Sequence, residues 1–112
     1  MRAAMARGSA VPDAILCHGD ILAAGALRAL GERGTKVPSQ VSVVGGTGLP
    51  VSQGELSSLT RVRQPFAEIG RAVVEMICER AARGGIGLPG RFLPAGFICG
   101  GTTRPSENER LG

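Results

Sequence analysis

The hydrophobic and polar positions of this chain predict short strands that alternate with helices. Residues 14–17 and 41–44 are apolar without alternation, a pattern typical of parallel strands covered on both faces. Between them, residues 20–33 are rich in alanine and leucine and are predicted to form a helix that ends at Gly34, with Pro38 preventing its continuation. A strand, a helix and a second strand within about 30 residues indicate a parallel α/β sheet.

The first predicted helix carries little bulk on any side. Its residues 23–26 are alanine or glycine. Small side chains allow a helix to approach a sheet closely, so this helix is predicted to be the crossover between the two strands. Asp20 is expected to cap it, because a carboxylate at that position accepts backbone N–H bonds and complements the helix dipole.

A second helix is predicted after an extended segment at residues 59–63. Pro65 is expected at the first helical position, where its missing N–H costs nothing, and Gly84 is expected to begin the stop. Glu79 and Arg83 are four residues apart and are expected to form an ion pair. The apolar residues of this helix recur at three- and four-residue spacing and form a stripe of Phe66, Ile69, Gly70, Val73, Met76 and Ile77.

The composition indicates one globular domain with a polar tail. The chain has 112 residues, of which 43% are hydrophobic and 20% charged, within the usual range of a single domain. Residues 92–99 are predicted to form a final strand, although Pro94 and Gly96 weaken the pattern. We therefore expect a domain at residues 1–104 and a polar tail at residues 105–112.

The charge pattern argues against direct binding of nucleic acid by this chain. The formal net charge is +4, but the arginines are scattered or alternate with glutamates, and no basic run of five residues occurs. No aromatic side chains interleave with the arginines as stacking platforms. The excess of basic residues is interpreted as belonging to a solvent-exposed surface.

The cysteines and the apolar runs predict a cytoplasmic protein without a membrane partner. Cys17, Cys78 and Cys99 are an odd number, widely spaced and embedded in apolar sequence, which favours buried free thiols in a reducing compartment. Residues 1–10 lack the continuous apolar core of a signal peptide. The apolar runs are far shorter than the roughly 20 residues that span a bilayer.

The residue pattern does not support catalysis, a metal site or a cofactor. The glycine-rich stretch after residue 44 has Val51 where a dinucleotide fingerprint needs its third glycine, and it lacks the lysine of a phosphate-binding loop. Cys17 and His18 are adjacent in an extended segment and point to opposite faces, so they do not converge on one metal ion. His18 is the only histidine, and no Gly-x-Ser-x-Gly elbow is present. We predict that the protein is not an enzyme.

Four segments of the chain stand in a distinctive order and spacing. They are PDAILCHGD at residues 12–20, the alanine-rich residues 23–30, VPSQVSVVG at residues 37–45 and LTRVRQPFAEIGR at residues 59–71. Together they resemble the effector-binding domain of the lactose-repressor/galactose-repressor (LacI/GalR) family of transcription regulators. The resemblance implies an α/β fold, a partial type I periplasmic-binding-protein-like fold with a parallel sheet and flanking helices, whose amino-terminal part is missing.

The family architecture implies where the chain crosses between subdomains. In this family two α/β subdomains clamp a small effector, often a sugar or a purine, and a separate amino-terminal helix-turn-helix reads the operator as a dimer. By this resemblance, the chain leaves the carboxyl-terminal subdomain at residues 59–65 and returns near Phe97.

The ligand residues implied by the resemblance are Gly19, Asp20, Thr47 and Arg63. The family often has Asn-Asp where this chain has Gly19 and Asp20, and an effector-binding aspartate where it has Thr47. An arginine common near the end of the family is replaced by Gly100. For Asp20 a helix cap and a cleft-facing carboxylate both remain open, and for Arg63 a ligand contact and a surface ion pair remain open.

The predicted function is that of the small-molecule-sensing and dimerising portion of a LacI-type DNA-binding transcriptional regulator. Its expected partners are a small polar effector, such as a sugar or a purine-like molecule, and a second copy of the chain as a homodimer or oligomer. DNA would be contacted only through a helix-turn-helix that this chain lacks. The alternatives are a fragment of a free-standing sugar- or solute-binding protein, and a truncated remnant without ligand activity.

Overall fold

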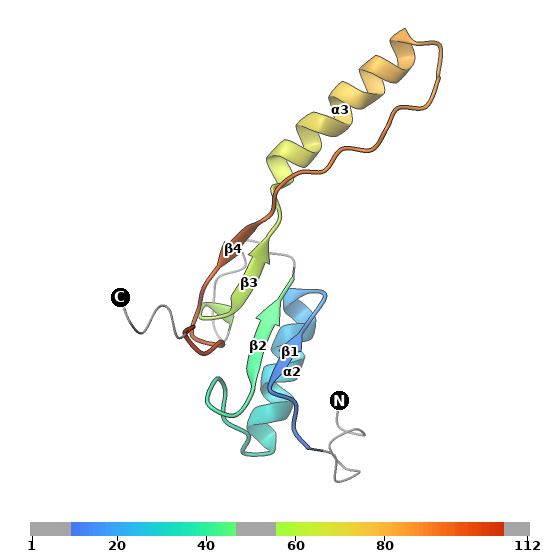
Figure 1. Cartoon of the computed structure of the whole chain (residues 1–112). Coiled ribbons are helices and arrows are strands. Elements are labelled where there is room, and N and C mark those ends of the chain that lie inside the picture. Colours follow the sequence, from blue (N-terminus) through green and yellow to red (C-terminus); the bar gives the residue numbers. More distant parts are fainter. Residues whose placement is uncertain (1–9, 47–55, 107–112) are drawn as a thin grey trace. The chain divides into compact units, whose positions relative to one another are not determined.

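The computed structural model describes residues 10–46 and 56–106, which divide into two compact units (Figure 1). The first unit contains the described residues up to Arg63 and those from Phe97 onward, and the second is Gln64–Gly96. The two boundaries coincide with the crossings implied by the family resemblance.

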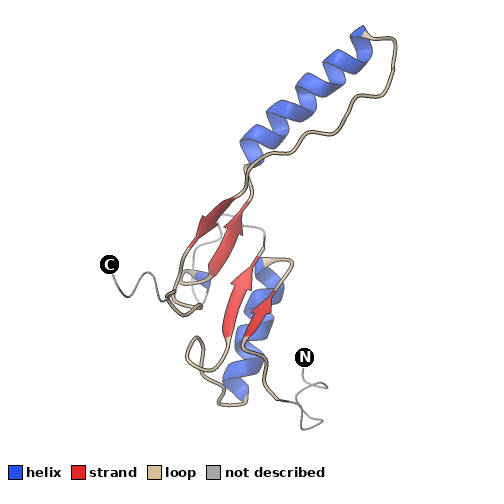
Figure 2. Cartoon of the chain, viewed as in Figure 1, coloured by secondary structure: helices blue, strands red, loops and turns tan. Residues whose placement is uncertain are grey.

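The first unit is built on a sheet with the strand order β1-β2-β3-β4 (Figure 2). Strands β1 (Ala14–Leu16), β2 (Ser42–Gly45) and β3 (Thr60–Arg63) are parallel neighbours, as predicted for an α/β unit. Strand β4 (Gly96–Ile98) lies beside β3 and runs in the opposite direction. It is shorter than the predicted strand at residues 92–99, because Pro94 lacks the N–H that a sheet ladder needs.

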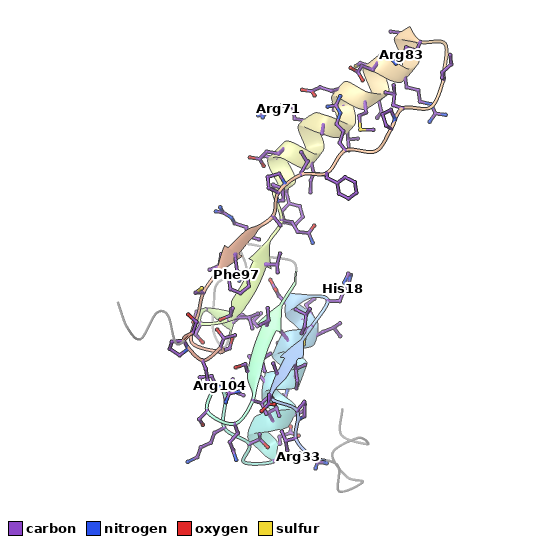
Figure 3. All side chains as sticks on the ribbon, viewed as in Figure 1. His18, Arg33, Arg71, Arg83, Phe97 and Arg104 are labelled. Atoms are coloured by element: carbon purple, nitrogen blue, oxygen red, sulfur yellow. The ribbon has the colours of Figure 1, made fainter. Side chains whose placement is uncertain are left out.

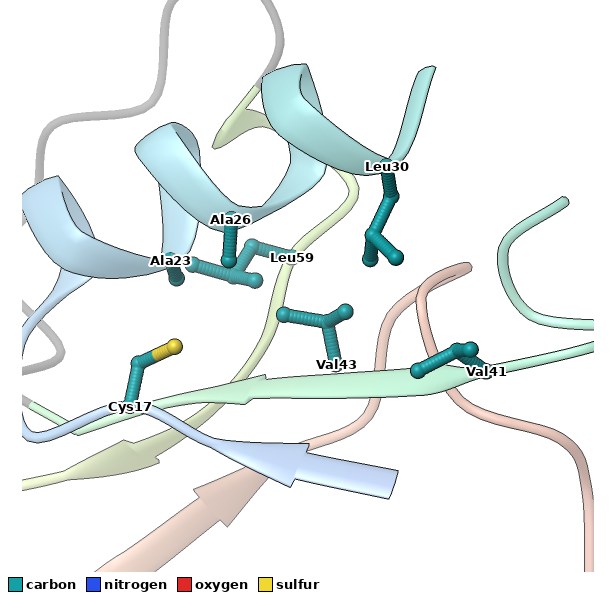
Figure 4. Packing of buried hydrophobic residues seen from close by; sticks show 7 residues of the cluster. All are labelled: Cys17, Ala23, Ala26, Leu30, Val41, Val43 and Leu59. Carbon is teal, nitrogen blue, oxygen red and sulfur yellow. The ribbon is translucent and has the colours of Figure 1, made fainter. Parts of the chain in front are cut away.

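Helix α2 (Asp20–Glu32) packs on the sheet through its small residues, which confirms the predicted crossover helix. Its buried apolar side chains face strand β2 (Figure 4). Ala23 and Leu30 are fully buried. The methyl side chains of Ala23 and Ala26 leave room for the helix backbone to lie close to the strand. The core cluster consists of Cys17, Ala23, Ala26, Leu30, Val41, Val43 and Leu59.

The two ends of α2 differ in how well the sequence predicted them. Gly34 has a φ of 70° and ends the helix in the left-handed conformation that favours glycine, as expected. At the start, the N-cap position belongs to Gly19, which has no side chain, and Asp20 is the first helical residue. The predicted cap at Asp20 is therefore shifted by one residue, although its charge still lies in the first turn, at the positive end of the helix dipole.

Replacement of Gly25 by alanine is expected to stabilise the first unit by about 1 kcal/mol. Gly25 lies in the interior of α2, is exposed, and an added Cβ meets nothing within 4 Å. Alanine loses less conformational entropy than glycine when a helix forms. The urea midpoint of unfolding should rise with an unchanged slope, and a fall in the midpoint would contradict the position of Gly25 on the solvent side.

The second unit consists of helix α3 (Phe66–Ala82) and the segment that follows it. Pro65 occupies the N-cap rather than the first helical position, and Gly84 and Gly85 end the helix with φ values of 68° and 84°. Every residue of α3 is described, and none is buried. The apolar side of the helix lines a groove of about 340 Å³, which is bordered by Gln64, Pro65, Ile69, Ala72, Val73, Met76, Arg91, Phe92, Leu93 and Ala95.

The charged pairs of the second unit differ from the expected helical pair. Glu79 contacts Arg91 at 3.5 Å, and Arg91 also bonds to Glu75 at 2.8 Å. Because one guanidinium from the following segment reaches both glutamates, Glu79 pairs with Arg91 rather than with Arg83. All of these side chains are well exposed to water, so their contribution to stability is small.

The prediction of three buried thiols holds for one cysteine only. Cys17 follows β1 and is buried in the core, and this burial raises the pKa of its thiol. Cys78 and Cys99 are exposed, so the prediction was wrong for both. Apolar neighbours in the sequence did not translate into burial, since Cys78 belongs to a helix without any buried residue.

Candidate functional site

The carboxyl ends of three parallel strands meet at one edge of the sheet in the first unit. β1 leads through Cys17 and His18 into the start of α2, β2 ends at Gly45, and Arg61 of β3 lies opposite Gly45 in the strand register. In open α/β sheets, ligands bind outside the carboxyl ends of the strands. This edge is therefore the candidate functional site.

A buried ion pair joins two elements at this edge. Nη1 of Arg61 lies 4.0 Å from Oδ2 of Asp20, and their residues are only 9% and 2% exposed. Charged side chains are rarely buried unless they are paired, because leaving water is costly for each charge. The pair therefore ties the first turn of α2 to β3 and places both charges within the candidate site.

Gly45 makes room for this pair. A Cβ at Gly45 would lie 2.6 Å from Oδ1 of Asp20 and 2.8 Å from Cδ2 of Leu59, both far inside van der Waals contact. Because Gly45 has no side chain, the carboxylate of Asp20 can lie over the end of β2.

Gly46 continues the close packing along the same edge. A Cβ at Gly46 would collide with the carbonyl oxygen of His18 and would lie 2.8 Å from that of Cys17. The backbone after β2 thus lies directly against the backbone after β1. A larger side chain at this position would not fit in this arrangement.

The residues proposed from the sequence differ in how deeply they are buried. Gly19 is half-buried, Asp20 is buried, and Arg63, the last residue of β3, is exposed. Thr47 lies outside the described residues. Figure 3 shows His18 near the carboxyl end of β1, pointing outward, and its side chain is exposed.

Arg61 is the residue of this edge that the sequence reasoning missed. The segment LTRVR contained a usable signal, because side chains alternate along a strand and residues two apart share a face. Leu59 is buried in the core, so Arg61 belongs to the face that is covered by α2, whereas Val62 points to the other face.

A second polar cluster holds the end of the described chain between β2 and β3. The hydroxyl of Thr102 donates to the carbonyl of Val43 at 2.7 Å and accepts from the backbone N–H of Thr60 at 2.9 Å. The Thr102 carbonyl also accepts from the N–H of Val43 at 2.8 Å. Thr102 therefore bridges the two strands beside the first residue pair of their register.

Gly100, at the position of the missing family arginine, has no room for a side chain. A Cβ there would collide with the carbonyl oxygen of Ser58 and would lie 2.8 Å from the carbonyl carbon of Leu59. The N–H of Gly100 donates to the hydroxyl of Thr60 at 2.9 Å, which holds the backbone in this close approach. The close packing around Gly100 therefore leaves no space for the arginine that is common at this position in the family.

Within residues 10–46 and 56–106, no group of three or more His, Cys, Asp or Glu side chains could hold a metal ion. No helix in the same ranges is long and apolar enough to cross a membrane.

The sequence model of the periplasmic binding protein-like domain matches residues 1–103, which is most of the chain. The chain belongs to this family. Proteins related to this chain confirm its resemblance to LacI/GalR regulators. The HTH-type transcriptional repressor CytR of Escherichia coli K12 is 32% identical over 93 residues, which cover 83% of this chain and 27% of the repressor. The ribose operon repressor of Halalkalibacterium halodurans is 27% identical over 96 residues, which cover 86% of this chain and 29% of that protein.

Solved structures agree with this assignment of the periplasmic binding protein-like domain. The lac repressor bound to ONPG superimposes with a TM-score of 0.76 at 30% identity, over 90% of this chain and 30% of the repressor chain. A LacI-type transcription regulator from Bifidobacterium animalis subsp. lactis gives a TM-score of 0.74 at 31% identity, over 93% of this chain and 37% of that one. The chain thus spans about a third of the length of these regulators and corresponds to part of their effector-binding-domain-like region.

Proposed function

We propose that this domain is the carboxyl-terminal, effector-sensing part of a LacI-type transcriptional regulator. In this role it binds a small polar molecule reversibly and does not catalyse a reaction. DNA is contacted by a helix-turn-helix of the whole regulator and not by this chain, and the regulator acts in the cytoplasm. The curated relatives are transcriptional repressors, which supports a regulatory rather than an enzymatic role.

The observation that carries the proposal is the group of polar and glycine residues at the carboxyl edge of the sheet. The buried pair of Asp20 and Arg61 stands at the ends of adjacent elements, where open α/β sheets bind ligands. Of the residues proposed from the sequence, Gly19, Asp20 and Arg63 belong to this edge, and Thr47 follows β2 in the sequence. The exposed side chain of Arg63 suits a contact that forms only when a ligand arrives.

The proposed assembly is a homodimer. One structurally similar protein is described as a dimeric lac repressor, at 30% identity and a TM-score of 0.74. Light scattering of the purified 112-residue chain tests this part of the proposal. A mass of two chains supports it, and a monodisperse monomer at all concentrations contradicts it.

Ligand binding should raise the thermal stability of the chain. Ribose and a purine base are suitable first probes, because the relatives include a ribose operon repressor and the HTH-type repressor PurR. A ligand at 100 times its dissociation constant stabilises a protein by about 2.7 kcal/mol, which is a readily measured shift of the unfolding midpoint.

The residue assignment is tested with a matched pair of variants. Arg63→Ala is expected to reduce the ligand-dependent shift, whereas Arg71→Ala, on the exposed surface of α3, is expected to leave it unchanged. Equal loss in both variants would argue against a specific role for Arg63. An unchanged midpoint with a broad panel of sugars and purines would argue for a remnant without ligand activity.

A further inference from the structure

Arg61 has buried hydrogen-bond donors without an acceptor. The side chain is 10% exposed, and within the described part of the chain its Nε and Nη1 atoms have no hydrogen-bond partner. Buried charged donors without acceptors are costly, and a group that supplies acceptor oxygens would recover that cost.

The ion pair with Asp20 does not satisfy these donors. The separation of 4.0 Å between Arg61 Nη1 and Asp20 Oδ2 is too long for a hydrogen bond, so the carboxylate contributes charge compensation only. Turning the guanidinium toward a new acceptor therefore breaks no hydrogen bond between these two atoms. Arg61 therefore lies near the carboxylate of Asp20, but its Nε and Nη1 donors remain available for another acceptor.

The surroundings of Arg61 favour a negatively charged group. Asp20 lies in the first turn of α2, a helix of 13 residues, and the N-cap Gly19 adds no side chain. The positive end of a helix dipole and its first backbone N–H groups attract anions. Arg61 and the helix start therefore both contribute positive potential at one place on the carboxyl edge, and the carboxylate of Asp20 compensates it in part.

We propose that Arg61 binds the oxyanion of an acidic effector, a small molecule that carries a phosphate or a carboxylate group. This inference rests on the proposed sensing function and adds the chemical class of the ligand. Arginine suits this role, because guanidinium N–H groups donate short charge-assisted hydrogen bonds to such oxygens. Gly19 and Gly100 provide no polar side chain for a neutral sugar, which is consistent with recognition through charge.

The test uses the purified 112-residue chain with inorganic phosphate and with acetate, each compared with chloride at equal ionic strength. Two-dimensional amide NMR spectra and unfolding midpoints are recorded during each titration. Phosphate or acetate is expected to shift the amide signals of Gly45 and Arg61 in a saturable manner and to raise the midpoint above that in chloride. The anion that binds at the lower concentration identifies the oxyanion class, phosphate or carboxylate.

Variants separate binding by Arg61 from a purely structural ion pair. Arg61→Gln is expected to weaken phosphate binding at least tenfold, whereas Arg83→Gln, in the second unit, leaves it unchanged. Asp20→Asn is expected to strengthen it, because the competing carboxylate is gone. If Arg61→Gln does not fold, the wild-type shifts and Asp20→Asn decide the question.

Several outcomes would overturn the inference. Signals that respond equally to chloride and phosphate would do so, as would shifts that avoid Gly45 and Arg61, or weaker anion binding by a folded Asp20→Asn variant. Stabilisation by ribose without any response to phosphate or acetate would overturn the anion assignment and leave the sensing function intact. No response to any of these ligands would count against both.

Discussion

Gly100→Ala is expected to destabilise the first unit by about 3 kcal/mol or more, enough to remove much of the stability of a small domain. The added Cβ would collide with the carbonyl oxygen of Ser58 and would lie 2.8 Å from the carbonyl carbon of Leu59. Both are backbone atoms. Leu59 is 2% exposed, and the carbonyl of Ser58 accepts from the N–H of Gly101 at 2.7 Å, so neither neighbour can move aside as a flexible side chain would. Urea unfolding followed by circular dichroism measures the loss.

The neighbouring glycine provides the control for this experiment. A Cβ at Gly101 would lie 3.6 Å from Cβ of Ser58, which is ordinary van der Waals contact. Gly101→Ala is therefore expected to change the free energy of unfolding by less than about 1 kcal/mol. Equal effects of the two variants would show that the close approach at Gly100 does not govern stability. Gly100→Arg, which restores the common family residue, should be at least as damaging as Gly100→Ala.

Thr102→Val is expected to cost about 2–4 kcal/mol. The two side chains have nearly the same shape, so the packing volume is kept and only the hydroxyl is lost. Without it, the N–H of Thr60 and the carbonyl of Val43 each lose their bond to Thr102 in a buried environment. Each buried backbone group left without a partner costs about 1–3 kcal/mol. Hydrogen exchange should also accelerate at the Thr60 amide.

Thr102→Ser is the matching control. Serine keeps the oxygen that accepts from Thr60 and donates to Val43, and it removes only a methyl group, so a loss of about 1 kcal/mol is expected. If valine and serine destabilise equally, the effect comes from the methyl group and the bridging role of the hydroxyl is wrong. Unchanged exchange at Thr60 in the valine variant would lead to the same conclusion.

The local elements were predictable because their causes are local. Short apolar runs, an alanine-rich segment and the glycine at position 34 indicate strands, a crossover helix and its end by backbone preference and periodicity alone. The parallel α/β class follows from the order of these elements, and the observed register of β1, β2 and β3 agrees with it. The order of the four family segments also indicated the regulator family.

The composition of the carboxyl edge was only partly predictable. Sequence reasoning named Asp20, a charged residue that lies at this edge, and Arg63, but it did not name Arg61. Both arginines lie on one strand, and the pattern of residues 59–63 does not alternate strictly, so it did not show which side chain is covered. The position of α2 over the face that carries Leu59 decides that Arg61 is buried.

By itself, the sequence determined the elements, their order and the family, since propensity, periodicity and turn chemistry act over a few residues. Only the tertiary structure decided which polar groups meet. Thr102 forms hydrogen bonds with Thr60 and Val43, which precede it in the chain by 42 and 59 positions. Arg61 pairs with the carboxylate of Asp20 at the start of α2. Such pairings depend on how the strands and helices pack together. The type of a side chain does not by itself determine which residue it contacts or whether it is buried.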